Sequence, residues 1–118
     1  MKRFLATYMG SASASAKAAW EQKDPEEIRA IQGRGMAAWG AWMAQHADRI
    51  VDAGAPLGKT KRASRDGIAD ISNQLTAYVI VEAESHEAAA RMFDQHPHFT
   101  IFPGDSVEIM EILPMPGG

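Results

Sequence analysis

Cysteine is missing from this chain of 118 residues. Its absence excludes a disulfide framework, a thiolate metal site and a thiol nucleophile, and it fits a reducing compartment. No window approaches the ~20 apolar residues of a membrane-spanning helix, and no apolar stretch typical of a secretory signal follows residues 1–10. We therefore expect a cytoplasmic protein with no membrane partner.

An excess of positive charge is missing too, because 12 Lys and Arg residues stand against 15 Asp and Glu, a net charge of −3. This balance argues against a nucleic-acid partner. One basic cluster comprises Lys59, Lys61, Arg62 and Arg65. It could hold a phosphate or an anionic substrate, but a solvated hairpin explains it as well, and it lacks the interleaved aromatic residues of single-strand binders.

Fingerprints of nucleotide and nucleophile sites are also absent. No G-x-G-x-x-G pattern follows a strand, residues 54–59 lack the spacing of a phosphate-binding loop, and no serine lies in a nucleophile elbow. The histidines have no third ligand at a telling spacing, so we expect no metal site. No cofactor is expected either.

The chain does contain a long C-terminal segment, His96–Pro114, around which we expect the fold to be arranged. Its strand, predicted over Ser106–Leu113, has apolar residues on both faces, interrupted only by Glu108 and Glu111. A strand that is apolar on both faces needs cover on both sides. The cover comes from the same chain or from a second copy of it.

The preceding chain alternates strands and helices. Arg3–Met9 predicts a strand, and 11–17 predicts a short connection or a weak helical turn, with Trp20 as its anchor. A helix then starts at Asp24-Pro25, a strong capping signal, and runs to Asp52-Ala53-Gly54. Its interior glycines, Gly33, Gly35 and Gly40, predict either a break near Gly33–Gly35 or close approach to the sheet, and we favour close approach.

The second half predicts a strand over 55–63, a hairpin tip at Arg65-Asp66-Gly67, a strand over 75–83, and a helix that Ser85 caps and that ends at or before His96. With the final strand, the order is βαββαβ. We therefore predict a single domain, 1–118, of the α+β, ferredoxin-like class, with a four-stranded antiparallel sheet, helices on one face and a tail from about 114. The other sheet face stays open in a monomer, which predicts a homodimer through sheet-to-sheet packing.

Several short motifs carry a family resemblance. They are Asp52–Gly58 after the first helix, Asp66-Gly67, Glu84–Ala89 after an aromatic-bearing strand, His96-Pro97, and Gly104–Ile109. Together they resemble the YCII-related family of the dimeric α+β barrel superfamily. The resemblance implies a ferredoxin-like protomer, a sheet-to-sheet dimer and a pocket between sheet and helices.

Some members of that family carry a His and an Asp proposed as an acid/base pair. Asp52 matches the position of the Asp, just past the first helix. The His belongs on that helix, where this chain has Met36 and Trp39, and His46 lies close to the helix end. Related superfamily members include isomerases and small monooxygenases that act on aromatic compounds.

The residues themselves suggest two sets of site candidates. Asp52, His96 and His98 are candidate catalytic groups, since a histidine titrates near neutral pH, but a turn residue and a structural connector are alternative roles. An aromatic pocket could be lined by Tyr8, Trp39, Trp42 and Tyr78, which at these spacings could equally be core.

Three functions follow from these candidates. The first is a homodimer that binds a small aromatic or acidic molecule between helix and sheet. The second is a cofactor-free isomerase or monooxygenase-like enzyme that uses a His/Asp acid/base pair. The third is a purely structural or regulatory dimer whose pocket is filled by its own side chains.

Overall fold

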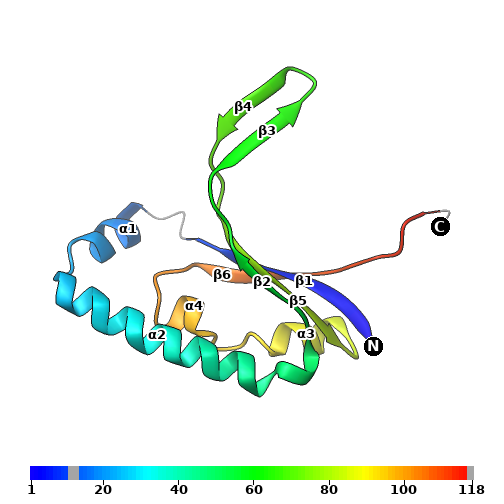
Figure 1. Cartoon of the computed structure of the whole chain (residues 1–118), viewed down its shortest axis with the longest axis horizontal. Helices are drawn as coiled ribbons and strands as arrows, with labels where there is room; N and C mark the ends of the chain where they lie inside the picture. Colours follow the sequence, from blue (N-terminus) through cyan, green and yellow to red (C-terminus); the bar gives the residue numbers. More distant parts are fainter. Residues whose placement is uncertain (11–13, 117–118) are drawn as a thin grey trace.

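The computed structural model describes residues 1–10 and 14–116, and for 14–17 it describes the backbone alone. Part of the predicted connection over 11–17, and the last two residues of the predicted tail, therefore lie outside the described residues. The elements in order are β1 (Lys2–Met9), α1 (Ala14–Glu21), α2 (Pro25–Gln45), a 3-10 turn η1 (Ala47–Arg49), β2 (Ile50–Pro56), β3 (Thr60–Ser64), β4 (Gly67–Ile71), β5 (Leu75–Ala83), α3 (His86–Arg91), α4 (Pro97–Thr100) and β6 (Ser106–Glu111) (Figure 1).

Four strands form an antiparallel sheet in the order β2-β5-β1-β6. The class is therefore α+β, and the order is consistent with the predicted ferredoxin-like arrangement. β1 lies in the centre, where Ala6 pairs with Val79 on one side and with Ile109 on the other. The final strand, β6, for which the sequence predicted cover on both faces, lies at the edge of the sheet. It ends at Glu111, so that Ile112 and Leu113 lie beyond it and are exposed.

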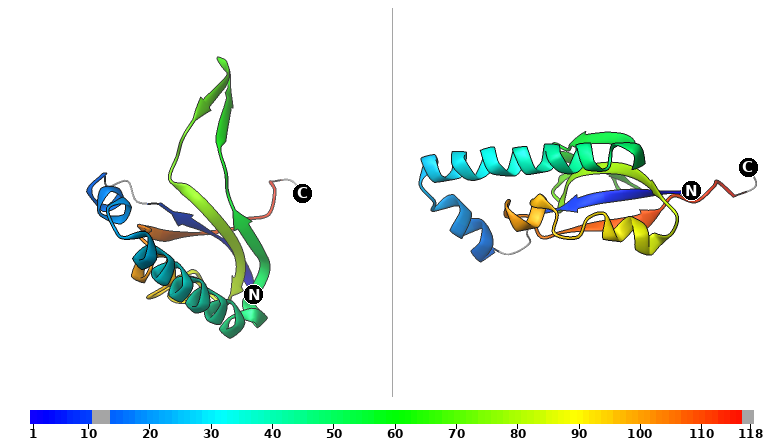
Figure 2. Two further views of the ribbon diagram at one scale, coloured as in Figure 1. Left: turned by 60° about the vertical axis from the view of Figure 1, so that its left-hand side comes forward. Right: turned by 90° about the horizontal axis from the view of Figure 1, so that it is seen from below.

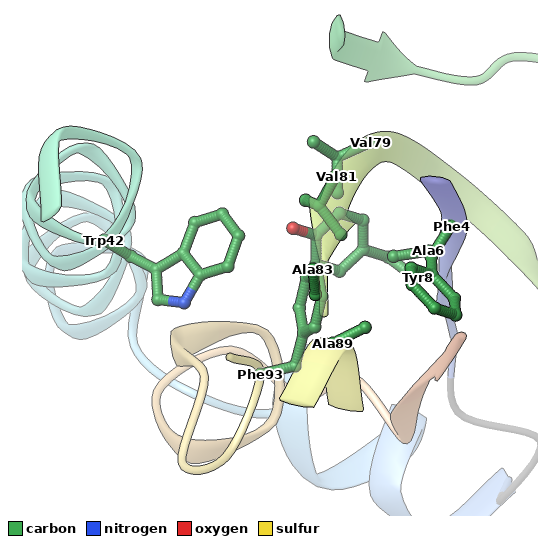
Figure 3. Packing of buried hydrophobic residues seen from close by; sticks show 9 residues of the cluster. All are labelled: Phe4, Ala6, Tyr8, Trp42, Val79, Val81, Ala83, Ala89 and Phe93. Atoms are coloured by element: carbon green, nitrogen blue, oxygen red, sulfur yellow. The ribbon is translucent and has the colours of Figure 1, made fainter. Parts of the chain in front are cut away.

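Alternation along the strands separates two faces of the sheet. The inner face buries Phe4, Ala6 and Tyr8 of β1 and Val79, Val81 and Ala83 of β5. Trp42 of α2, Ala89 of α3 and Phe93 pack onto these residues, which completes the core (Figure 3). The opposite, outer face carries Leu5, Thr7 and Met9 of β1, Tyr78 and Ile80 of β5, and Met110 of β6. Helices α2, α3 and α4 lie on the inner side, and α1 lies beyond the end of the sheet (Figures 1 and 2).

Helix α2 runs unbroken through its three glycines for 21 residues. It starts as predicted, because the Asp24 side chain accepts a hydrogen bond from the Glu26 amide and Pro25 takes the first helical position. Gly35 is buried, and a Cβ there would lie 2.4 Å from the Phe102 ring. The close approach is therefore to a loop aromatic rather than to the sheet, and the predicted break is not observed.

The glycines of α2 give a matched stability test. A Cβ on Gly40 meets nothing within 4 Å, so we expect Gly40→Ala to raise the free energy of unfolding by about 0.5–1 kcal/mol. Gly35→Ala forces the Phe102 ring to move, and we expect it to be less stable than Gly40→Ala by about 1–3 kcal/mol. Urea denaturation of both variants measures the difference. Equal stabilities would show that Phe102 does not pack on Gly35.

Between β2 and β5 the chain forms a separate hairpin, β3–β4, whose tip lies at the predicted turn, Arg65-Asp66. The strand predicted over 55–63 is thus two strands, separated by residues 57–59. Asp52-Ala53-Gly54 does not end the helix, which stops at Gln45, but lies inside β2. The hairpin stands away from the sheet on the side opposite the helices (Figure 1).

The segment after β5 contains two short helices. Ser85 caps α3 as predicted, because its hydroxyl accepts from the Ala88 amide at 3.0 Å. The helix ends at Arg91, and Pro97 begins α4, a turn that was not predicted. In the described part of the chain, the helices are too short or too polar to cross a membrane.

Candidate functional site

A cavity of about 790 Å³ lies on the inner side of the sheet, where the helices diverge from the strands. It is bounded by α1, α2, the end of β1, the β2–β5 edge and the loop after α4. Its aromatic lining residues are Tyr8, Trp20, Trp39 and Phe102, and Tyr78, whose side chain strand alternation places on the outer face, also borders it. Its polar lining residues are Glu21, Ser72, Asn73, Gln74, Thr76 and His98.

Trp39 of α2 is the central aromatic residue of the cavity wall. Its ring centroid lies 4.7 Å from that of Tyr8 and 6.1 Å from those of His98 and Phe102. These separations are those of favourable aromatic pairs, so the rings hold one another in place. The cavity therefore has a rigid aromatic wall built from α2, β1 and the loop after α4.

His96 is fully buried behind this wall, against Tyr8, Trp39 and Trp42. Its Nδ1 accepts a hydrogen bond from the backbone N–H of His98 at 3.0 Å, which caps α4. Because Nδ1 is the acceptor, the ring proton of neutral His96 is assigned to Nε2. Nε2 then donates to the Tyr8 hydroxyl, 3.4 Å away.

The protonation states of this pair follow from their burial. Burial, with smaller contributions from nearby His98 and His46, lowers the pKa of His96 from 6.5 to about 4. Burial also raises the pKa of Tyr8 well above its ordinary value of 10.0. At neutral pH His96 is therefore uncharged and Tyr8 keeps its proton. Since the hydroxyl oxygen accepts from His96, the Tyr8 proton is available to another acceptor.

His98 lines the cavity, and its ring is held by a hydrogen bond to the backbone of β1. Its Nε2 lies 2.7 Å from the carbonyl oxygen of Met9, so Nε2 donates to that oxygen and Nδ1 is the ring nitrogen left for another partner. Gly104 packs on this ring, because a Cβ there would lie 2.3 Å from Nε2. His98 is thus fixed in its orientation beside the cavity.

Asp52 does not join the histidines. It lies on β2 opposite Ile80, is exposed, and its Oδ1 accepts from the Gly54 amide at 2.8 Å. It is not among the residues that line the cavity, in contrast to Met36 and Trp39, which occupy the positions where the resemblance places a histidine. The structure therefore brings His96 and His98 together but leaves the predicted His/Asp pair apart.

Of the four aromatic candidates, three lie at the cavity and one lies in the core. Tyr8 and Trp39 line the cavity, and Tyr78 borders it although strand alternation places its side chain on the outer face. Trp42 belongs to the core, where its indole N–H donates to the Met92 carbonyl at 2.7 Å. Trp20 and Phe102 line the cavity without having been candidates. Trp20 had been expected only to anchor its segment.

Metal ligands do not gather at this site. Among the residues the structure describes, no three His, Asp or Glu side chains lie close enough to hold a metal ion.

The pH dependence of stability tests the burial of His96. The unfolded chain takes up the His96 proton near pH 6.5 and the folded chain only near pH 4, so stability falls as the pH falls between these values. We expect a loss of about 1.5 kcal/mol between pH 6.5 and about 5. Urea denaturation across this range measures it, with His96→Gln as the control that lacks the titrating group. A wild-type slope equal to that of His96→Gln contradicts a neutral buried histidine.

The comparisons with known proteins bear on the fold alone. Neither the family models nor the curated proteins that were searched gave a match. Among solved structures, the chain is similar to 5-chloro-2-hydroxyhydroquinone dehydrochlorinase (TftG) from Burkholderia phenoliruptrix AC1100, in complex with 2,5-dihydroxybenzoquinone. The two are 15% identical, with a TM-score of 0.53, over 92% of this chain and 90% of the other. The likeness supports the fold class over nearly the whole length.

Proposed function

We propose that this protein binds a small, uncharged aromatic molecule in the cavity beside Trp39. The observation that carries the proposal is the cavity itself, whose size falls within the roughly 300–1,000 Å³ usual for ligand sites. Flat rings from three separate parts of the fold line it, and such rings stack on aromatic ligands. The neighbour TftG, which holds a quinone, supports a ligand of this shape.

The charge of the lining favours a neutral ligand over an acidic one. Within the described residues, the cavity is lined by one acidic side chain, Glu21, and by no Lys or Arg. A carboxylate ligand would leave water without a cationic partner, which is costly. Of the aromatic and acidic ligands that the sequence left open, we therefore propose the neutral aromatic one.

Two polar groups give this ligand its orientation. The lone pair on Nδ1 of His98 suits a ligand hydroxyl, and the free proton of Tyr8 suits a carbonyl or ether oxygen. Both are held by hydrogen bonds to other parts of the site. We infer a ligand that carries oxygen substituents on an aromatic ring.

A pair of probes of equal size tests the proposal. 6-Hydroxy-2-naphthamide is neutral, whereas 6-hydroxy-2-naphthoate carries one negative charge. We expect the amide to bind more tightly in isothermal titration calorimetry. Phe102→Ala removes a wall of the cavity and should raise the Kd of the amide roughly tenfold. The matched control is Phe99→Ala, which removes an exposed ring outside the cavity and should leave the Kd within about twofold.

Equal or tighter binding of the naphthoate, or equal effects of the two phenylalanine variants, would contradict the neutral aromatic site. Failure of both probes to bind would favour the structural or regulatory dimer.

An acid/base enzyme is the second candidate, and it is favoured by the His98 ring at the cavity and by the Tyr8 hydroxyl, which is hydrogen-bonded to His96. In such an enzyme we infer that His98 accepts a proton from the ligand, since it lines the cavity while His96 does not. Asp52 has no part in this arrangement because it lies outside the cavity lining.

We also propose that the chain folds as one unit and forms a homodimer through the outer face of the sheet. Leu5, Met9, Tyr78, Ile80 and Met110 place apolar surface on this face, and the helices leave it uncovered. A second sheet packed at ~10 Å would bury it. Membership of the YCII-related family is likewise a proposal, which rests on the short motifs of the sequence.

A further inference from the structure

The hairpin between β2 and β5, residues 57–74, is here called the arm. Its strands β3 and β4 pair only with each other, and none of its residues is buried in the described chain. Its Ile68 side chain is 76% exposed. An isolated two-stranded hairpin is at best marginally stable in water. The arm therefore needs contacts that its own chain, as described, does not supply.

The overall dimensions show how far the arm stands out. The radius of gyration is 16.4 Å, whereas a compact chain of this length has about 13.5 Å. The arm rises on the outer side of the sheet, away from the helices (Figures 1 and 2). Its five-residue strands span roughly 16 Å, more than the ~10 Å between stacked sheets. A molecule that covers the outer face would lie beside the arm.

Charge favours a second copy of this chain as that molecule. The arm has four basic and two acidic residues, whereas the rest of the chain has eight basic and thirteen acidic residues, a net charge of −5. Lys61 pairs with Asp70 inside the arm at 2.6 Å. Lys59, Arg62 and Arg65 form no ion pair with the described residues, and neither do Glu82 and Glu108 on the outer face.

We propose that the arm of each protomer packs against the other protomer in the homodimer. Ile68 of one arm contacts the apolar part of the outer face on the other protomer, and the basic side chains of the arm contact its acidic residues, Glu82 and Glu108. Two-fold symmetry makes the contact reciprocal, so both arms become covered and the unpaired charges of both kinds find partners. This inference rests on the proposed homodimer and adds to it the part of the chain that reaches across.

A cross-linking experiment on the full chain tests the contact. The chain has no cysteine, so Ile68→Cys gives a single site for a benzophenone maleimide. Unlabelled and ¹⁵N-labelled protein are mixed, refolded together and irradiated. We expect peptides that join an arm of one isotope to the outer-face strands of the other. Ala37→Cys, exposed on α2, is the control and should give no such light–heavy pairs above background.

A matched pair of charge variants supplies a second readout. Arg62→Glu with Arg65→Glu should raise the dimer Kd by about tenfold in sedimentation equilibrium. Arg29→Glu with Arg34→Glu makes the same charge change on exposed α2 residues and should leave it within about twofold. Equal Kd values for the two double variants would overturn the arm contact.

The two proposals fail in different ways. A monomer by light scattering at all concentrations would overturn the homodimer and the arm contact together. A dimer whose Ile68→Cys arm cross-links only within its own chain, or not at all, would overturn the arm contact alone. A neutral aromatic ligand in the cavity would stand in both cases.

Discussion

Gly54→Ala is expected to lower the free energy of unfolding by about 3 kcal/mol or more. Gly54 has a φ of +69°, and a Cβ there would lie 1.7 Å from the Tyr78 carbonyl oxygen. An alanine would therefore be strained by its backbone conformation and would also push β2 away from β5. Urea denaturation monitored by circular dichroism measures the loss.

The control for this variant is Gly58→Ala, because a Cβ on Gly58 meets nothing within 4 Å. Its stability should stay within about 0.5 kcal/mol of the wild type. Since residues 53–56 line the cavity, the strained turn at Gly54 also shapes one of its walls. Equal stability of the two variants would contradict the close crossing of β2 and β5.

Ile80→Glu is expected to dissociate the proposed homodimer. Ile80 lies in the middle of the outer face, and two-fold symmetry would place two buried carboxylates in one interface. The cost of two unpaired charges corresponds to a rise in dimer Kd of roughly a thousandfold. Light scattering coupled to gel filtration measures the mass over a range of concentrations.

The protomer itself should remain folded, because the outer face is not part of the core. Met115→Glu adds the same charge to an exposed residue in the C-terminal segment and is the control, with no expected change in mass. A dimer that persists in Ile80→Glu would show that copies associate through another surface.

The fold was predictable from the sequence where local signals and tertiary packing agree. Asp24-Pro25 begins α2 and Ser85 begins α3, because a capping side chain satisfies free amides whatever surrounds it. Alternation of side chains predicted β1 and β5 as strands, and the structure places these two in the centre of the sheet. The final strand misled the prediction, since it ends at Glu111 and the apolar side chains of Ile112 and Leu113 beyond it are exposed.

The region around Asp52 was not predictable in this way. Asp-Ala-Gly after a helical pattern is a common end of a helix, yet α2 ends seven residues earlier and the motif forms a bulge in β2. Within this bulge the Asp52 carboxylate accepts a hydrogen bond from the Gly54 amide. What decides the outcome is the pairing of β2 with β5, a contact between distant segments.

The site was predictable in its residues more than in its geometry. Trp39 and Trp42 are three residues apart on one helix, but Trp39 faces the cavity and Trp42 packs on Phe93. The difference between the two tryptophans depends on where the segment after β5 packs against α2, which the helix sequence does not show. The spacing of His96 and His98 likewise could not show that one is buried and that the other lines the cavity, because Pro97 and the α4 turn fix their directions.

The methionine methyl groups test the central claim most directly. Met36 and Met43 line the cavity, whereas Met9 and Met110 lie on the outer face. In ¹³C-methyl-methionine spectra, saturating 6-hydroxy-2-naphthamide should shift the Met36 and Met43 signals by its ring current and leave Met9 and Met110 in place. Shifts confined to Met9 and Met110, or no shift at any methionine, would contradict a ligand site between α2 and the sheet.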